Sequence, residues 1–125
     1  MSTTPVTPTG PPSLVVCPGV VLANHEVSLE GLNPVLRQFL AALGPIHEGL
    51  FGTVATVTSG VDKIHVASSK HYKGDAVDLR INDKAGREQL TFTIILIELS
   101  GRYRLAVFDE SFLPGQAHIH VEVAG

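Results

Sequence analysis

Residues 75–81, DAVDLRI, contain the alternating pattern on which the fold prediction for this 125-residue chain is based. Successive side chains of a β-strand point to opposite faces of a sheet. Val77, Leu79 and Ile81 therefore occupy one face and are expected to join an apolar core. The other face carries Ala76, Asp78 and Arg80. One strand thus presents a core to one side and a polar site to the other.

Apolar spacing predicts further elements on both sides of this strand. A helix is expected to begin after the N-cap residue Asn33, with Pro34 in its first position, and to end at Gly44-Pro45. Residues 85–99 have a mixed pattern that favours a mostly buried helix. The predicted strands are residues 53–58 (TVATVT), 75–81, 103–108 (YRLAVF) and 117–123 (AHIHVEV). This order predicts the α+β class, a largely antiparallel sheet with helices packed against it.

The chain is expected to form one domain preceded by a tail. Residues 1–13 contain four prolines and four threonines, a composition that predicts a flexible segment. Residues 14–27 alternate short apolar runs with Pro18-Gly19 and predict a strand or arm packed on the domain. We expect residues 14–125 to fold as a single unit, since 125 residues are too few for two ordinary domains.

Composition narrows the classes of function. Cys17 is the only cysteine, which excludes an intrachain disulfide and a multi-thiolate zinc finger. The net charge of −3 and pI near 6.0 argue against nucleic-acid binding. The later apolar run Ile94–Ile97 is far shorter than the roughly 20 residues of a membrane span. No Lys or Arg precedes the apolar residues 14–22, so we expect a protein made in the cytoplasm without a secretory signal peptide. We also expect a monomer.

Four of the six histidines are expected at polar, site-facing positions: His65, His71, His118 and His120. On a strand, His118 and His120 share one face, which makes them candidates to bind a metal together with the carboxylate of Asp78. Two histidines and one carboxylate leave an open position on tetrahedral zinc, as catalytic sites require. The alternative is that the histidines only form hydrogen bonds across the sheet and that Asp78 is an exposed strand carboxylate.

Residues 69–78, SKHYKGDAVD, match at five positions the SxHxxGxAxD motif of the zinc D-Ala-D-Ala carboxypeptidase and L-alanyl-D-glutamate peptidase family. The downstream His118-Ile-His120 resembles the second zinc motif of that family. The same two motifs occur in the hedgehog signalling domain, which shares the fold. His65 and the pair Glu110-Ser111 resemble further positions of the hedgehog pattern. The similarity covers roughly residues 33–124 and implies a hedgehog-like or peptidase-like zinc fold.

The resemblance implies a role for each site residue. Zinc would be held by His71, Asp78 and His120, although strand periodicity alone does not choose between His118 and His120. Glu110 would act as the general base, with Asp109 as the alternative. His65 and His118 would stabilise the oxyanion or support the metal ligands.

The implied function is hydrolysis of an amide bond in the peptide stem of bacterial peptidoglycan, by a zinc carboxypeptidase or endopeptidase. Such an enzyme without a signal peptide would act at the cell wall as a phage or leaderless lytic protein. Many family members carry an arginine soon after a Ser-Gly pair, whereas Ser59-Gly60 is followed here by Val-Asp-Lys63, and Lys63 is the candidate replacement. Two alternatives stay open: a non-catalytic zinc-containing binding module of the same fold, and an unrelated α+β protein.

Overall fold

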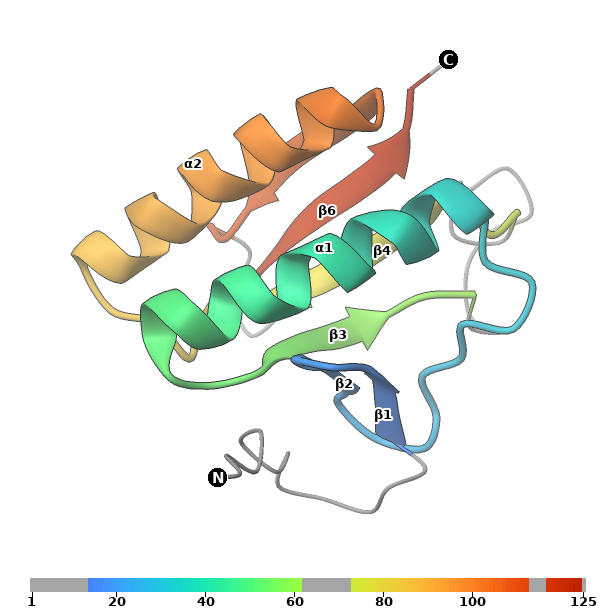
Figure 1. Ribbon diagram of the computed structural model, residues 1–125, viewed down its shortest axis with the longest axis horizontal. Helices are drawn as coiled ribbons and strands as arrows, with labels where there is room; N and C mark the ends of the chain where they lie inside the picture. The colour runs from blue at the N-terminus through green and yellow to red at the C-terminus, as the bar shows by residue number, and fades with distance from the viewer. Residues whose placement is uncertain (1–13, 62–72, 113–116, 125) are drawn as a thin grey trace.

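The computed structural model describes residues 14–61, 73–112 and 117–124. These residues form a six-stranded sheet in the order β1-β2-β3-β4-β6-β5, with two helices on one face (Figure 1). Adjacent strands are antiparallel except β2 and β3, which are parallel. The predicted α+β class, with a largely antiparallel sheet and helices packed on it, is therefore confirmed.

The elements follow the predicted order, preceded by two short strands. The predicted tail, residues 1–13, lies outside the described residues. No helix in the described ranges is long and apolar enough to cross a membrane. The elements are β1 (Val15–Cys17), β2 (Val20–Leu22), α1 (Pro34–Phe51), β3 (Ala55–Ser59), β4 (Ala76–Arg80), α2 (Arg87–Arg102), β5 (Leu105–Glu110) and β6 (His118–Val123).

The core lies between the sheet and the two helices. Leu36, Phe39, Leu40 and Leu43 of α1 are fully buried there, as are Val57 of β3 and Ile119 and Val121 of β6. Val77, Leu79 and Ile81 are also fully buried in this cluster, so the alternation predicted for residues 75–81 is confirmed.

Helix α1 begins where the sequence predicts it but continues past the predicted end. The Asn33 side chain accepts a hydrogen bond from the backbone N–H of Val35 at 2.9 Å. The prediction that Gly44-Pro45 ends the helix is wrong, because α1 runs on to Phe51 with Pro45 inside it. Pro45 is exposed, so water can reach the backbone carbonyl that loses its hydrogen-bond donor at that turn.

Gly44 lets α1 approach the turn between β1 and β2. A Cβ atom at Gly44 would overlap the backbone carbonyl of Pro18, and a Cβ at Gly19 would overlap the backbone of Gly44. Nothing lies within 4 Å of the equivalent position at Gly49, five residues along the same helix. The two helical glycines therefore have opposite consequences when a methyl group is added.

We expect Gly44→Ala to lower the free energy of unfolding by about 1–3 kcal/mol, because the new methyl group has no space. Gly49→Ala should raise it by about 0.5–1 kcal/mol, since alanine is the better helix former. Chemical denaturation of both variants measures the difference. Equal stabilities of the two variants would contradict the close packing of α1 on the β1–β2 turn.

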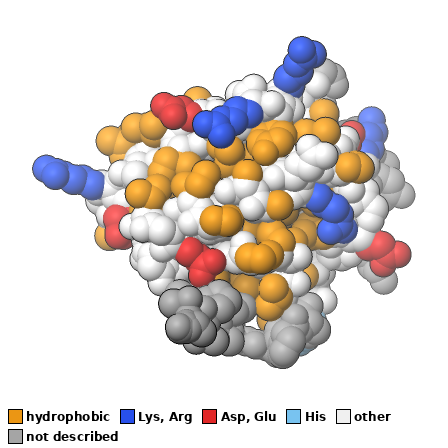
Figure 2. Space-filling view, in the orientation of Figure 1, with side chains coloured by type: hydrophobic (Ala, Val, Ile, Leu, Met, Phe, Trp, Pro, Cys, Tyr) orange, Lys and Arg blue, Asp and Glu red, His pale blue; other side chains and the backbone are white. Residues whose placement is uncertain are grey.

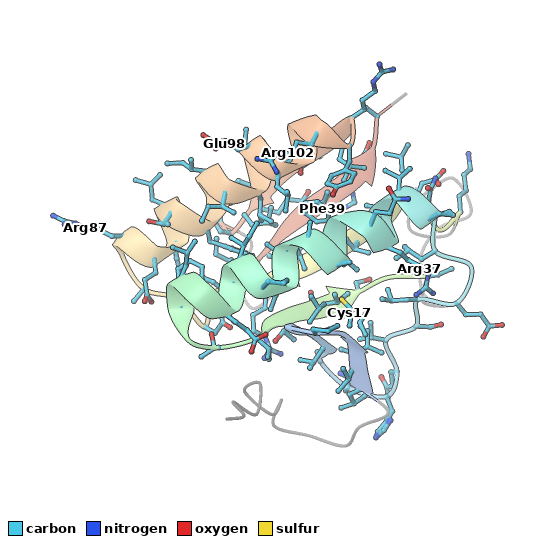
Figure 3. All side chains as sticks on the ribbon, viewed as in Figure 1. Cys17, Arg37, Phe39, Arg87, Glu98 and Arg102 are labelled. Carbon is cyan, nitrogen blue, oxygen red and sulfur yellow. The ribbon has the colours of Figure 1, made fainter. Side chains whose placement is uncertain are left out.

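Helix α2 is confirmed, but the prediction that it is mostly buried is wrong. Phe92, Leu96, Leu99 and Ser100 face the core. Leu90, Ile94 and Ile97 are 63%, 47% and 55% exposed. Hydrophobic side chains gather on this outer face among scattered charges (Figure 2), and Arg87 and Glu98 project from the same helix (Figure 3). Apolar residues on both sides of α2 explain why its sequence shows only a weak helical periodicity.

Strand β5 starts later than predicted and extends further. Arg104 has a positive φ of 56°, and the N–H of Tyr103 donates to Ser100 at the end of α2. The chain therefore turns at these two residues, and the strand cannot begin before Leu105. The predicted strand 103–108 is shifted to Leu105–Glu110, which places Glu110 inside the sheet.

His47, near the C-terminal end of α1, is a buried histidine. His47 Nδ1 is 2.7 Å from the carbonyl oxygen of Thr53, and the ring contacts Phe51 and Phe92. Burial lowers the pKa of His47, and the nearby ammonium of Lys84 lowers it further, against the opposing effect of the Thr53 hydrogen bond. His47 is therefore held neutral, with Nδ1–H donating to Thr53.

This histidine is expected to make stability depend on pH. Its pKa is lower in the folded than in the unfolded chain, so the unfolded chain binds more protons as the pH falls below about 6.5. The stability contribution of His47 is present above that pH and is lost as the pH falls. Denaturation between pH 7.5 and 5 should show a smaller loss for His47→Asn, which keeps a donor but does not titrate. The same loss in both proteins would contradict this assignment.

Candidate functional site

The sheet face opposite the helices carries two rows of polar and aromatic side chains across β4, β6 and β5. Strand register sets these rows, because directly opposite residues of neighbouring strands have Cβ atoms about 4.5–5.5 Å apart. The first row is Asp78, His120 and Phe108, and the second is Arg80, His118 and Glu110. Candidate residues that are up to 42 positions apart in the sequence thus become neighbours.

Asp78 and His120 are in direct contact at the centre of the site. His120 Nδ1 lies 2.9 Å from Asp78 Oδ1, and both side chains are largely buried. The second carboxylate oxygen, Oδ2, lies 3.7 Å from His118 Nε2. Asp78 therefore faces both histidines of the His-x-His pair, one with each oxygen.

Glu122 holds His120 from the other side of the ring. His120 Nε2 is 2.8 Å from Glu122 Oε1. Burial acts to lower the pKa of His120, but its hydrogen bonds to Asp78 and Glu122 outweigh burial and raise that pKa above the usual value. With both ring nitrogens protonated, His120 donates to one carboxylate on each side.

His118 and Glu110 form a second close pair. His118 Nε2 lies 2.6 Å from Glu110 Oε1, a short distance typical of a charge-assisted hydrogen bond. The His118 side chain is 14% exposed, whereas that of Glu110 is 38% exposed. The carboxylate can therefore reach a bound molecule while the buried imidazole fixes its position.

The donor set of Asp78 and His120 fits zinc. Two ligands of a tetrahedral zinc ion lie about 3.3 Å apart, given zinc–ligand distances near 2.0 Å. Asp78 Oδ1 and His120 Nδ1, which are 2.9 Å apart, would have to separate by only a few tenths of an ångström to ligate one zinc ion together. A zinc-ligating histidine usually donates its second N–H to a carboxylate, and Glu122 is in place to accept it.

The remaining predicted ligand, His71, lies outside the described residues, as do His65, Lys63 and Ser69. Within residues 14–61, 73–112 and 117–124, no three His, Cys, Asp or Glu side chains are grouped so as to hold a metal ion. The described part of the chain therefore contains two of the three predicted ligands, and the predicted zinc site would also need the segment that contains His71.

Asp109, the alternative base, lies on the opposite face of β5. It pairs with Ile119 in the register, and Ile119 is a core residue. Asp109 Oδ1 accepts a hydrogen bond from the backbone N–H of Ser111 at 2.9 Å. Among the two carboxylates considered, only Glu110 shares a face with the histidines.

A pocket of about 370 Å³ lies beside the Asp78–His120 and Glu110–His118 pairs, with Asp78 and His118 in its lining. It lies where β3 and β4 end and β6 begins, so three chain segments contribute its walls. Its lining is mostly polar: Thr58, Ser59, Asp78, Arg80, Asn82, Ala117 and His118. A peptide bound there would lie beside Asp78 and His118.

Two residues of this face were given no role in the site by the sequence analysis. Glu122 follows His120 by two positions in HIHVEV, and Arg80 follows Asp78 by two in DAVDLR. The alternation in residues 75–81 already places Arg80 on the site face, and the same period of two in HIHVEV would have placed Glu122 there. Comparisons of the chain with models of known protein families and with curated proteins found no match.

Proposed function

We propose that this protein is a zinc-dependent peptidase that hydrolyses an amide bond in the peptide stem of bacterial peptidoglycan. The main support for the proposal is that two pairs of side chains lie next to each other: Asp78 with His120 at 2.9 Å, and Glu110 with His118 at 2.6 Å. The first pair supplies metal ligands and the second supplies a positioned carboxylate. The motif in residues 69–78 supports the choice of metal and of substrate class.

Asp78 and His120 would hold the zinc ion together with His71. When bound, zinc supplies a Lewis acid that polarises a carbonyl and acidifies water to a pKa of roughly 7. Glu122 keeps the His120 ring oriented by accepting its Nε2–H. His120 would ligate the metal through Nδ1, the nitrogen that faces Asp78, after losing the proton that this nitrogen donates to Asp78.

Glu110 would serve as the general base. Its carboxylate is partly exposed and can accept a proton from the attacking water, then return it to the leaving amine. His118 acts as the positioning residue, because its Nε2–H donates to Glu110 Oε1 and fixes that side chain. His65 keeps its predicted role in stabilising the oxyanion.

Incubation of the zinc-containing protein with a pentapeptide stem ending in D-Ala-D-Ala tests this function. Mass spectrometry of the products distinguishes release of the terminal D-Ala from cleavage after L-Ala. We expect one of these cleavages, and we expect removal of zinc by a chelator to abolish it. A protein that binds zinc but cleaves neither bond would instead be the non-catalytic binding module.

A further inference from the structure

Arg80 has an unusual position in the candidate site. It is the last residue of β4 and lines the pocket beside Asp78 and His118. The register places it directly opposite His118 on the neighbouring strand, at a Cβ separation of about 4.5–5.5 Å. A bound peptide that reaches Glu110 and His118 would therefore come within reach of Arg80.

The guanidinium of Arg80 is half-buried and has no hydrogen bond or ion pair to any described residue. The neighbouring carboxylates are engaged elsewhere, because Asp78 contacts His120 and Glu110 contacts His118. An arginine presents five N–H donors in a planar fork that matches a carboxylate. Among the described residues, the Arg80 guanidinium is therefore a positive charge whose N–H donors are available on the pocket side of the sheet.

Apart from the carboxylate of Asp78 and the imidazole of His118, which pair with His120 and Glu110, the rest of the pocket lining around Arg80 is uncharged. Thr58 donates its hydroxyl to the backbone carbonyl of Asp78 at 3.4 Å, and Ser59 and the exposed Asn82 lie on the same walls. A guanidinium group surrounded by hydroxyl and amide groups can bind a small anionic group of a peptide. It does not suit an apolar or a cationic side chain.

We propose that Arg80 binds a free carboxylate of the substrate within about one residue of the scissile amide. This inference rests on the proposed function, since it assigns the substrate class of that same site. The carboxylate has two sources in a stem peptide: the C-terminus of D-Ala-D-Ala, or the α-carboxylate of D-Glu.

Binding measurements on the zinc-containing protein test the inference without requiring turnover. Titration calorimetry would compare a pentapeptide stem with two analogues, one amidated at the C-terminus and one amidated at the D-Glu α-carboxylate. We expect one amidation to weaken wild-type binding about 10- to 100-fold, as expected for a lost charged hydrogen bond. That analogue identifies the source of the carboxylate.

Arg80→Gln should remove the preference for the free carboxylate, and Arg80→Lys should restore part of it. Arg102→Gln, on α2 at the opposite layer (Figure 3), is the matched control and should keep the full preference. A preference that survives in Arg80→Gln, or wild-type binding that ignores both amidations, would overturn the inference. Retained preference without any hydrolysis would instead refute the peptidase and leave the carboxylate site standing.

Discussion

Replacement of Glu110 by glutamine is expected to lower the rate of stem-peptide hydrolysis by about 10²–10⁴-fold, the usual contribution of a general base. Glutamine has the same shape and can keep a hydrogen bond to His118, so the fold and the zinc content should be unchanged. Steady-state kinetics with matched metal analysis measures both quantities.

Asp109→Asn is the matched control for this result. It removes a carboxylate from the next residue of the same strand, but from the face that points away from the histidines. Its rate should remain close to that of the wild type. The reverse ranking of the two variants would show that the base has been assigned to the wrong carboxylate.

Replacement of Asp78 by asparagine is expected to weaken zinc binding by more than about 100-fold. Loss of a group that only supports a ligand already costs about 10–100-fold, and Asp78 is a proposed ligand itself. The amide should still accept a hydrogen bond from His120 at the distance of 2.9 Å seen for the carboxylate. Zinc titration against a competing chelator gives the affinity.

His120→Ala provides a second variant, so that the result does not depend on one substitution. It should also lose zinc, whereas Asp109→Asn should bind zinc as tightly as the wild type. Circular dichroism checks that each variant is folded. Wild-type zinc affinity in both Asp78→Asn and His120→Ala would exclude these residues as ligands.

Much of the fold follows from local patterns in the sequence. The alternation in DAVDLRI and HIHVEV correctly predicts which side chains join the apolar core, because one face of β4 and β6 packs against the helices, although Ala76 and Asp78 on the other face of β4 are also buried. The end of α1 could not be predicted in the same way. Proline usually ends a helix, but Pro45 is on the solvent side, and buried Leu43 and His47 stabilise the turns around it.

The sequence predicts which residues lie on the site face but not which of their side chains contact each other. Period-two spacing places His118 and His120 on one face, yet it does not give their partners. Those partners depend on strand order, because β6 lies between β4 and β5 although it follows both in the chain. This order brings Asp78 to His120 and Glu110 to His118.

The metal content of the purified wild-type protein is the direct test of the proposed zinc site. Protein prepared without chelator would be analysed for all transition metals and for protein concentration in the same sample. We expect one zinc ion per chain, held by Asp78 and His120 together with His71. Absence of stoichiometric zinc, in protein that also fails to bind added zinc, would rule out the proposed zinc site.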